Sequence, residues 1–454
     1  MIPEKLLHDL HGIKGFDEAA FIAAHQRDPV TSVRLNRAKD IGLFAGQEKV
    51  PWCAEGVYLK ERPVFTLDPA YHAGAYYVQE ASSMFLEHFT RQILQDRKEL
   101  RVLDLCAAPG GKSTLIASLL DKNSLLICND VIRTRASILE ENMTRWGYMN
   151  TWVTSNDPRD FARLPGYFDM ILVDAPCSGS GLFRKDARAL DEWSEGNVQL
   201  CEARQQRIIA DVWPSLKQHG VLIYATCSYS PQEDEQILDW LATTYEVTTI
   251  DIPVNEKWGI VKVTSDKGMV GYRFFPDKVK GEGFFIAAIQ KKEEAELPRF
   301  TKFKSLHDKK IQQQAGYLLK DTDVGFLQTD KDNFSAIRAV HEPDLQVLQK
   351  AVYLRKTGLK LGMPSAKDWL PAHDVALSID ANENLSAIKV NREQALRFLK
   401  REDMQDIGET GKGWLLINYN GLGLGWVKSL GNRINNYLPK HWRIRMDISE
   451  NDLV

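Results

Sequence analysis

The chain has 454 residues, enough for two to four domains, and its 44% hydrophobic and 26% charged content is ordinary for a globular protein. A formal net charge of -3 excludes a uniformly basic nucleic-acid-binding chain, so any basic surface must be local. No run approaches the roughly 18 apolar residues of a membrane span, and the first residues lack the apolar core of a signal peptide. We therefore expect a cytoplasmic protein without a membrane partner.

The first 95 residues mix short helical and extended segments, and we assign residues 1–95 to an N-terminal extension that takes part in RNA binding. From residue 101 onward, short β-rich runs recur, at 101–106, 124–130, 151–155, 168–175 and 220–227. Amphipathic helical stretches separate most of them, as at 112–120 and 135–147. This alternation predicts an α/β domain with a parallel, doubly wound sheet, to which residues 283–290 would add an edge strand.

The charged stretch 291–310 is typical of a linker, although a solvated helix face is an equally good interpretation. Residues 311–454 form a second unit, with Gly-rich and aromatic strand-like segments in 413–445. The predicted division of the chain is 1–95, 96–292, 293–375 and 376–454. In it, 96–292 is the sheet domain, 293–375 is a linker with an intermediate domain, and 376–454 binds RNA.

A glycine loop, LDLCAAPGGKST (103–114), follows the first predicted strand and opens a helix. A phosphate-binding P-loop requires glycine five residues before Gly111, where Cys106 stands, so the loop does not match the P-loop and argues against an NTPase. Gly110 and Gly111 allow close approach of a ligand at the edge where such sheets bind nucleotides. Asp130 ends the second strand, where an acid commonly holds ribose hydroxyls, and Asp157 could receive an adenine amino group. The loop therefore predicts an adenosine compound, although Asp130 alone is equally well read as a surface carboxylate.

Six cysteines occur without a CxxC pair, so we expect neither a zinc ribbon nor a redox pair, and no metal. Four of them lie at or near the carboxyl ends of predicted strands: Cys106, Cys128, Cys177 and Cys227. For any one of them, a buried structural thiol is the simplest interpretation. Cys177 and Cys227 together, with Asp174 beside the first, favour chemistry.

Two thiols and one carboxyl group suit substitution at carbon 5 of a pyrimidine. A thiolate added to carbon 6 breaks the aromaticity of the ring and makes carbon 5 nucleophilic. A protonated Asp174 held against ring nitrogen 3 would stabilise the charge that develops there. The second thiol could then assist as the proton leaves carbon 5 and the first thiol is expelled.

The chain resembles the RsmB/NOP/NSUN family of S-adenosylmethionine-dependent RNA cytosine-5 methyltransferases in four motifs, LDLCAAPGGKST, DAPCSGSGLFRKD, ATCSYSPQEDE and RFFPDKVKGEGFF. The resemblance spans roughly residues 30–290 and begins with TSVRLN (31–36) and HAGAYYVQEASSM (72–84). Segments 183–208 and 425–445 resemble the RsmF-like bacterial branch that acts on small-subunit (16S) ribosomal RNA, the second of them its PUA-type module. The implied fold is a Rossmann-like class I methyltransferase sheet with an N-terminal extension and a C-terminal α+β, PUA-like RNA-binding domain.

The resemblance also implies roles for individual residues. Cys227 matches the nucleophile, Cys177 the cysteine that helps release the product, and Asp174 the acid that contacts cytosine. In DNA cytosine methyltransferases the nucleophile is instead the cysteine after proline, here Cys177, which is the rival assignment. The expected S-adenosylmethionine contacts are Cys106, Ala107, Ala108, Pro109, Gly110, Gly111, Lys112, Asp130, Arg135, Asp157 and Asp174.

The expected RNA contacts are basic. Residues 426–445 hold five basic side chains and no acid, interleaved with Trp426, Tyr437 and Trp442, which suits phosphates and unpaired bases but equally a small β-barrel with an aromatic core. The predicted RNA-binding residues are Arg184, Lys185, Lys428, Arg433, Lys440 and Arg443. We thus expect a monomeric enzyme that makes 5-methylcytosine in 16S ribosomal RNA of the small subunit. The alternatives are the same chemistry on transfer RNA and a ribosome-assembly factor that binds RNA without turnover.

Overall fold

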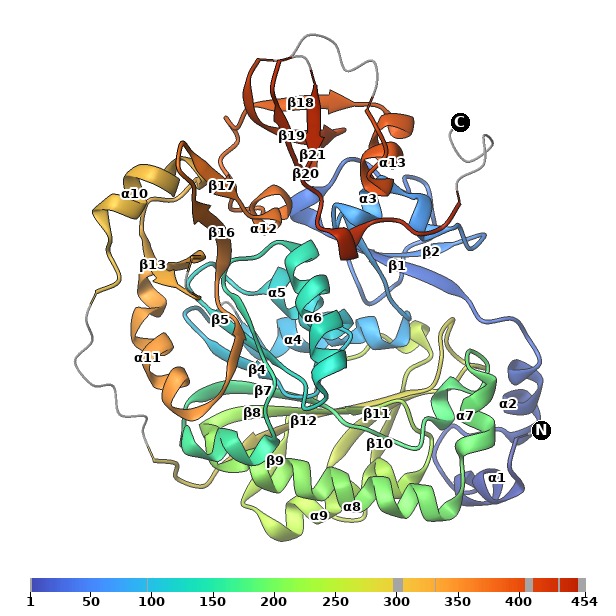
Figure 1. The fold of residues 1–454 in the computed structure, drawn as a ribbon. Helices are drawn as coiled ribbons and strands as arrows, with labels where there is room; N and C mark the ends of the chain where they lie inside the picture. Colours follow the sequence, from blue (N-terminus) through green and yellow to red (C-terminus); the bar gives the residue numbers. More distant parts are fainter. Residues whose placement is uncertain are drawn as a thin grey trace.

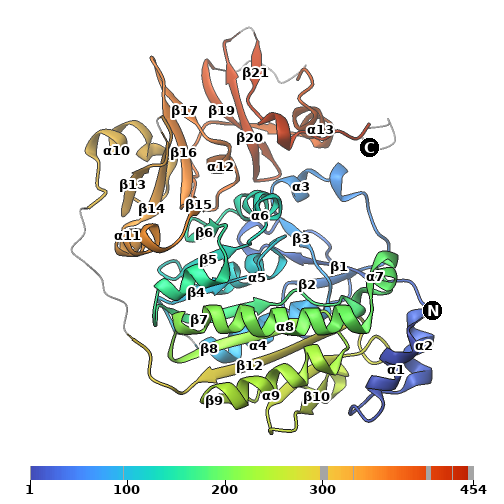
Figure 2. The same ribbon diagram turned by 60° about the horizontal axis from the view of Figure 1, so that its bottom comes forward.

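The computed structural model describes residues 2–95, 97–296, 305–330, 332–404, 411–431 and 433–447. A ten-stranded mixed sheet lies at its centre, with the N-terminal segments at one end and two C-terminal sheets beyond α6 (Figures 1 and 2). No helix in these described ranges is long and apolar enough to cross a membrane.

Five parallel strands form the middle of the central sheet: β4 (Arg101–Asp104), β5 (Leu125–Asn129), β6 (Thr151–Thr154), β7 (Phe168–Asp174) and β8 (Leu216–Thr226). Their spatial order is β8-β7-β4-β5-β6, so the direction of winding reverses between β4 and β7. The crevice at the carboxyl ends of strands on either side of such a reversal is where doubly wound sheets bind ligands. The predicted α/β sheet is confirmed.

Helices cover both faces of this sheet. On one face lie α4 (Leu86–Leu94), α5 (Gly111–Leu119) and α6 (Arg133–Trp146). On the other lie α8 (Glu195–Val212), α9 (Glu235–Thr244) and α11 (Glu342–Ala351). Figure 2 brings α8 and α9 to the front of the sheet.

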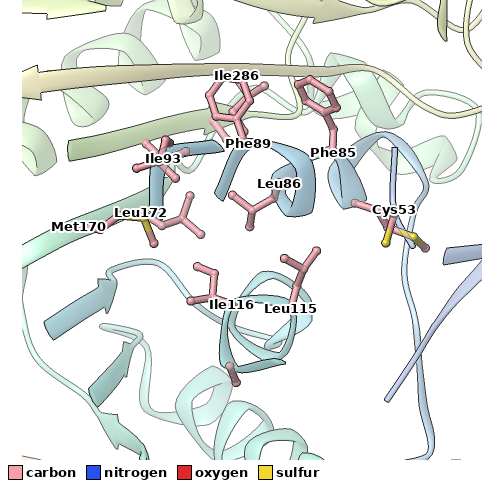
Figure 3. Packing of buried hydrophobic residues seen from close by; sticks show 14 of the residues in the cluster. Cys53, Phe85, Leu86, Phe89, Ile93, Leu115, Ile116, Met170, Leu172 and Ile286 are labelled. Carbon is pink, nitrogen blue, oxygen red and sulfur yellow. The ribbon is translucent and has the colours of Figure 1, made fainter. Parts of the chain in front are cut away.

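Successive strand residues alternate between the two faces, which explains the continuous apolar runs of the sequence. In β7, Met170 and Leu172 pack against α4 and α5, whereas Ile171 and Val173 face the layer of α8 and α9. Figure 3 shows the first of these layers, where Leu115 and Ile116 meet residues of α4. Cys128 lies fully buried in the same layer, as a structural thiol does.

Five antiparallel strands extend the central sheet: β9 (Val247–Thr249), β10 (Val261–Thr264), β11 (Val270–Phe274), β12 (Phe284–Lys291) and β15 (Leu354–Lys356). The prediction that residues 283–290 form an edge strand is wrong, because β12 pairs with β8 on one side and with β11 and β9 on the other. Lys291 still belongs to β12, so the predicted linker begins after it; its residues 297–304 lie outside the described ranges.

The opposite edge of the sheet comes from the C-terminal half of the chain. Strand β15 pairs antiparallel with β6, and the preceding α11 packs Leu345 and Leu348 into the core under the sheet. Asp344 of α11 accepts hydrogen bonds from Arg101 of β4 and from the Tyr167 hydroxyl, at 2.5 and 2.7 Å. The region after the predicted linker therefore contributes an edge strand and a covering helix to the central sheet.

The N-terminal region holds α1 (Glu4–Leu10), α2 (Glu18–His25), α3 (Pro69–His72), and a three-stranded antiparallel sheet of β1 (Thr31–Leu35), β2 (Gly56–Leu59) and β3 (Tyr76–Val78). Helices α1 and α2 pack Leu6, Leu10 and Phe21 against Phe183 and Tyr229, which follow β7 and β8. The N-terminal region therefore supports the loops at the carboxyl edge of the central sheet.

Two four-stranded sheets follow the central domain. The first consists of β13 (Val324–Gln328), β14 (Phe334–Arg338), β16 (Leu359–Pro364) and β17 (Trp369–Pro371), with α10 (Lys309–Ala315) and α12 (His373–Leu377) nearby. The second consists of β18 (Ala387–Val390), β19 (Gly413–Tyr419), β20 (Leu422–Ser429) and β21 (Ile434–Asn436), with α13 (Arg392–Lys400) against it. Figure 1 shows both above α6, in orange and red.

Candidate active site

The two predicted cysteines meet at the carboxyl edge of the sheet. Cys177 lies in the loop after β7 and Cys227 directly follows β8, and their Sγ atoms are 3.0 Å apart. Both side chains are partly buried. Parallel pairing of β7 with β8 brings these strand ends together, because Asp174 stands opposite Ala225 in the register.

Gly181 fixes how closely the two loops approach. Its N–H donates to the Cys227 carbonyl at 2.8 Å, and its own carbonyl accepts from Gly283 N–H at 3.1 Å. A Cβ at position 181 would lie 2.6 Å from the Gly283 oxygen and 2.7 Å from the Cys227 oxygen, so a side chain there would force the loops apart.

A lysine and a carboxylate form an ion pair at the same edge of the sheet. Lys112, on the first turn of α5, donates to Asp174 Oδ2 at 2.8 Å, and its Nζ lies 5.3 Å from the centre of the Phe284 ring. Burial works to lower the pKa of the Lys112 ammonium, but the charges of Asp174 and then of Cys227 outweigh it and raise that pKa. A fixed positive charge thus lies within electrostatic reach of the Cys227 sulfur.

The thiols themselves are not equivalent. The hydrogen bond to Cys227, followed by burial, raises the pKa of the Cys177 thiol well above its ordinary value. Cys177 therefore remains protonated near neutral pH, and its thiol can donate to the Cys227 sulfur.

The predicted cofactor residues line the next part of the same edge. Gly110, with φ +113°, turns the chain into α5, and a Cβ there would meet Leu139 at 3.3 Å. Arg135 donates to the Ala108 carbonyl at 2.7 Å and lies 3.4 Å from Asp130, so it joins the glycine loop to the end of β5. The Asp157 carboxylate follows β6, half-exposed, and caps the 3-10 helix Pro158–Arg163 by accepting from Arg159 N–H.

These groups fit an adenosine compound that carries a positive sulfonium. Asp130, Asp157 and Asp174 give three carboxylates at the carboxyl ends of β5, β6 and β7, and the glycines leave room for close approach. A further carboxylate, Asp104 at the end of β4, is fully buried, and its Oδ1 has no hydrogen-bond partner in the described part of the chain. The positive charge of such a ligand would be balanced by these acidic side chains.

Asp104 should make the stability of the protein depend on pH. Burial, together with the charges of Asp174 and Asp130, raises the pKa of its carboxyl from 3.8 to about 7, even though Ser113 donates to Oδ2 at 2.6 Å. Folding therefore binds a proton between these values, and stability is lost as the pH rises through that window. We expect the free energy of unfolding, measured with urea, to fall between pH 5 and pH 8 by on the order of 3 kcal/mol more in the unchanged protein than in Asp104→Asn. If the free energies of unfolding of the two proteins change with pH in parallel, the raised pKa of Asp104 is refuted.

Two basic residues follow the Cys177 loop and differ in exposure. Lys185 is exposed, as its predicted RNA contact requires. Arg184 is only 5% exposed and makes a bidentate pair with Glu282, with both bonds at 2.9 Å, and it also donates to the Gly281 carbonyl at 2.8 Å. In this structure the Arg184 donors are therefore taken by Glu282, itself a buried acid, and by the Gly281 carbonyl, so the side chain is not free to contact a phosphate as predicted.

The C-terminal basic segment presents three of its four predicted residues to solvent. Arg433, Lys440 and Arg443 are exposed. Lys428 is half-buried and donates to Asp368 at 2.7 Å, above the ring of Trp414.

The aromatic residues of this segment divide between core and surface. Trp426 is buried, donates to the Ala372 carbonyl at 2.9 Å, and belongs to the core between the two C-terminal sheets. The suggestion that it stacks on a base is therefore wrong. Tyr437 is exposed beside Trp414, with ring centres 4.5 Å apart, and Trp442 is half-buried.

Two buried residues at the site had no predicted role. Arg34, inside TSVRLN, donates to Gln79, to Thr114 and to the Gly111 carbonyl, and so supports the glycine loop from the N-terminal sheet. Glu233, inside ATCSYSPQEDE, accepts hydrogen bonds from the serines that follow both cysteines. Both residues lie inside motifs that carry the family resemblance, and this position in a motif is the sequence signal that could have identified them. Among the described residues, no group of three or more His, Cys, Asp or Glu side chains could hold a metal ion.

Family models match three parts of the chain. The model described as "16S rRNA methyltransferase RsmB/F" matches residues 91–290. The "N-terminal domain of 16S rRNA methyltransferase RsmF" matches residues 2–81, and the "Methyltransferase RsmF PUA domain" matches residues 386–444.

Two relatives named "Ribosomal RNA small subunit methyltransferase F" match almost the whole chain. The protein of Psychromonas ingrahamii is 32% identical over 452 residues, which cover 92% of each chain. That of Vibrio atlanticus is 30% identical over 472 residues, which cover 97% of each chain.

Two solved structures from Pyrococcus horikoshii are similar to the described fold. A methyltransferase homologue is 26% identical with a TM-score of 0.51, and the match covers 64% of this chain and 100% of that one. NSun6, crystallised with SFG, is 21% identical with a TM-score of 0.53, and the match covers 64% and 99%. Identity of 32% to a relative along nearly its full length, together with the three family models, shows that the chain belongs to the family of ribosomal RNA small subunit methyltransferase F.

Proposed function

We propose that this protein transfers a methyl group from S-adenosylmethionine to carbon 5 of cytosine in 16S ribosomal RNA, through a covalent bond between Cys227 and carbon 6. The observation that carries the proposal is the pair of sulfurs 3.0 Å apart beside the Lys112–Asp174 ion pair, at the edge that also bears the glycine loop.

Cys227 is the proposed nucleophile. Its sulfur lies 3.0 Å from the Cys177 sulfur and within electrostatic reach of the Lys112 charge, and as a thiolate it would attack carbon 6. S-adenosylmethionine, when bound, would supply the methyl group to carbon 5, and the electron pair of the broken sulfur–methyl bond would stay on its sulfur. The carbon 5 proton must leave and the Cys227–carbon 6 bond must break before the product is free. Cys177, in contact with Cys227, is the proposed helper of that release.

The ion pair of Asp174 with Lys112 refines the proposed role of the acid. The sequence predicts that a protonated Asp174 holds ring nitrogen 3, but in the structure Lys112 donates to this carboxylate in a 2.8 Å hydrogen bond. We therefore assign the contact with nitrogen 3 to the pair, in which Asp174 orients the proton that Lys112 carries.

S-adenosylmethionine supplies the electrophilic methyl group. The residues proposed to hold it are those of the glycine loop from Cys106 to Lys112, with Asp130, Arg135, Asp157 and Asp174. Asp130 would take the ribose hydroxyls and Asp157 the adenine amino group, in keeping with their places after β5 and β6.

Ribosomal RNA of the small subunit is the proposed partner, and the cytoplasm the proposed location of a monomer. The four-part division at residues 95, 292 and 375 belongs to the same proposal, with the last part as the RNA-docking module. Exposed Lys185, Arg433, Lys440 and Arg443, with half-buried Lys428, would contact phosphates. The target cytosine must leave its stack to reach the sulfurs beyond the ends of β7 and β8.

Bisulfite sequencing of RNA tests this function, because 5-methylcytosine resists conversion. We expect at least one protected cytosine in 16S RNA from cells that contain the gene, and its conversion in cells that lack it. Purified protein should restore protection when S-adenosylmethionine is added to the unmodified RNA or subunit. Gene-dependent protection in transfer RNA alone would favour the transfer-RNA alternative. RNA binding without any protected cytosine would favour the non-catalytic assembly factor.

A further inference from the structure

Glu233 joins the two cysteine loops through one buried carboxylate. It lies at the end of the 3-10 helix Pro231–Glu233 and is fully buried. Its Oε2 accepts from the Ser178 hydroxyl at 2.5 Å and from the Ser228 hydroxyl at 2.6 Å. Ser178 follows Cys177 and Ser228 follows Cys227, so the carboxylate holds the neighbour of each sulfur-bearing residue.

The other oxygen of Glu233 is also fully used. Oε1 accepts from the Ser178 N–H at 2.8 Å and from Gln205 of α8 at 3.2 Å. Gln205 additionally donates to the Pro176 carbonyl at 3.1 Å, immediately before Cys177. A buried carboxylate is costly unless its oxygens are satisfied, and here four hydrogen bonds satisfy it, three of them from the serines of the two loops.

The chain on either side of Glu233 is held rigidly. Arg273 of β11 pairs with Asp234 at 3.1 Å and with both oxygens of Glu235, and it donates to the Tyr229 carbonyl at 2.9 Å. Asp234 in turn accepts from Thr226, the last residue of β8, at 2.7 Å. Glu233 therefore extends from a fixed base into the gap between the loops.

We propose that Glu233 is a positioning residue that sets the separation of the Cys177 and Cys227 sulfurs by fixing Ser178 and Ser228 on one carboxylate. Its effect on turnover rests on the proposed function, whereas its effect on the sulfurs does not. A shift of about 1 Å between reacting groups can lower the rate roughly a hundredfold. Loss of a carboxylate that holds both loops is therefore expected to slow catalysis strongly.

Coupling of the two thiols by diamide measures their separation without RNA or cofactor. As the S–S bond forms, the N=N group of diamide takes up the two electrons and the two thiol protons. We expect the Cys177–Cys227 disulfide, followed by peptide mass spectrometry, to form at least about tenfold more slowly in Glu233→Ala. Glu233→Gln keeps the reach of the side chain, and the serine hydroxyls can turn to accept from its amide, so it should recover part of the rate.

Glu87→Ala is the matched control. Glu87 is a buried carboxylate of α4 that accepts from Cys53 and Arg91 and touches neither cysteine loop. Its loss should lower the melting temperature but leave the coupling rate within about twofold of the unchanged protein. If Glu233→Ala does not fold, the double variant Ser178→Ala/Ser228→Ala replaces it, with a slower coupling rate again expected. Unchanged coupling in the variant that folds would overturn the proposal.

Steady-state kinetics give the second measurement. Glu233→Ala should lower kcat for methyl transfer by roughly 10- to 100-fold while KM for S-adenosylmethionine and RNA stays within about threefold. A loss of kcat with unchanged thiol coupling would also overturn the proposal, because the effect would not pass through the sulfurs. If the unchanged protein does not methylate RNA but Glu233→Ala still slows coupling, the proposed function fails and the positioning role stands.

Discussion

Replacing Cys227 by alanine is expected to lower methyl transfer by at least about 10³-fold while RNA binding stays within about twofold. The substitution removes the sulfur that would bond to carbon 6 and leaves its surroundings in place. The Gly181 N–H donates to the backbone carbonyl of residue 227, which alanine retains, and Ser228 keeps its bond to Glu233. Transfer of labelled methyl groups to 16S RNA and a filter-binding titration measure the two quantities.

Cys201→Ala is the control for the loss of a thiol. Cys201 is buried on α8, and its weak contact, at 3.8 Å, is with Asn197. We expect this variant to keep its activity. Substantial methylation by Cys227→Ala, with loss of methylation in Cys177→Ala, would instead make Cys177 the nucleophile, as in the DNA enzymes.

Replacing Cys177 by alanine should trap the protein covalently on its RNA. The Cys177 thiol contacts the Cys227 sulfur at 3.0 Å, so replacing it leaves the nucleophile in place and removes the group proposed to assist product release. The Ser178 N–H still donates to Glu233, which keeps the loop in position. We expect turnover to fall by at least about 10²-fold and a band of protein joined to RNA to survive denaturing electrophoresis.

The double variant Cys177→Ala/Cys227→Ala identifies the bond in that band. It should form no covalent complex, since the sulfur that makes the bond is absent. Trapping that persists in the double variant would show attachment through another residue, and normal turnover by Cys177→Ala would remove this cysteine from the release step.

The sequence predicts the central sheet well because the signal for each strand is local. Apolar runs between turn residues locate β4 to β8 to within a few residues, and alternation with amphipathic stretches predicts their parallel order. The expectation that Cys177 and Cys227 share an edge follows from the same rule, since parallel strands end together. The spacing of the sulfurs does not follow, because it depends on Glu233 and Gly181.

Errors and omissions occur where the partner is distant in the chain. Residues 284–291 have the composition of a strand, but their place inside the sheet depends on β11 and β9, which carry weak signals of their own. The sequence around Arg184 suggests a phosphate ligand, whereas the structure pairs this side chain with Glu282, 98 residues later. The three acids 233–235 look alike in sequence, yet Glu233 meets serines whereas Asp234 and Glu235 meet Arg273.

The sequence by itself determined the sheet architecture, the glycine loop at its edge, the two cysteines and the family resemblance, because these depend on local periodicity and short motifs. Only the tertiary structure decided that β15 forms the edge of the sheet next to β6, with Leu354 opposite Thr154. It also decided that Lys112 pairs with Asp174 and that one buried carboxylate joins both cysteine loops. Such contacts depend on chain segments brought together by burial and pairing, and no local pattern specifies which charged side chain will lose its solvent and which partner will replace it.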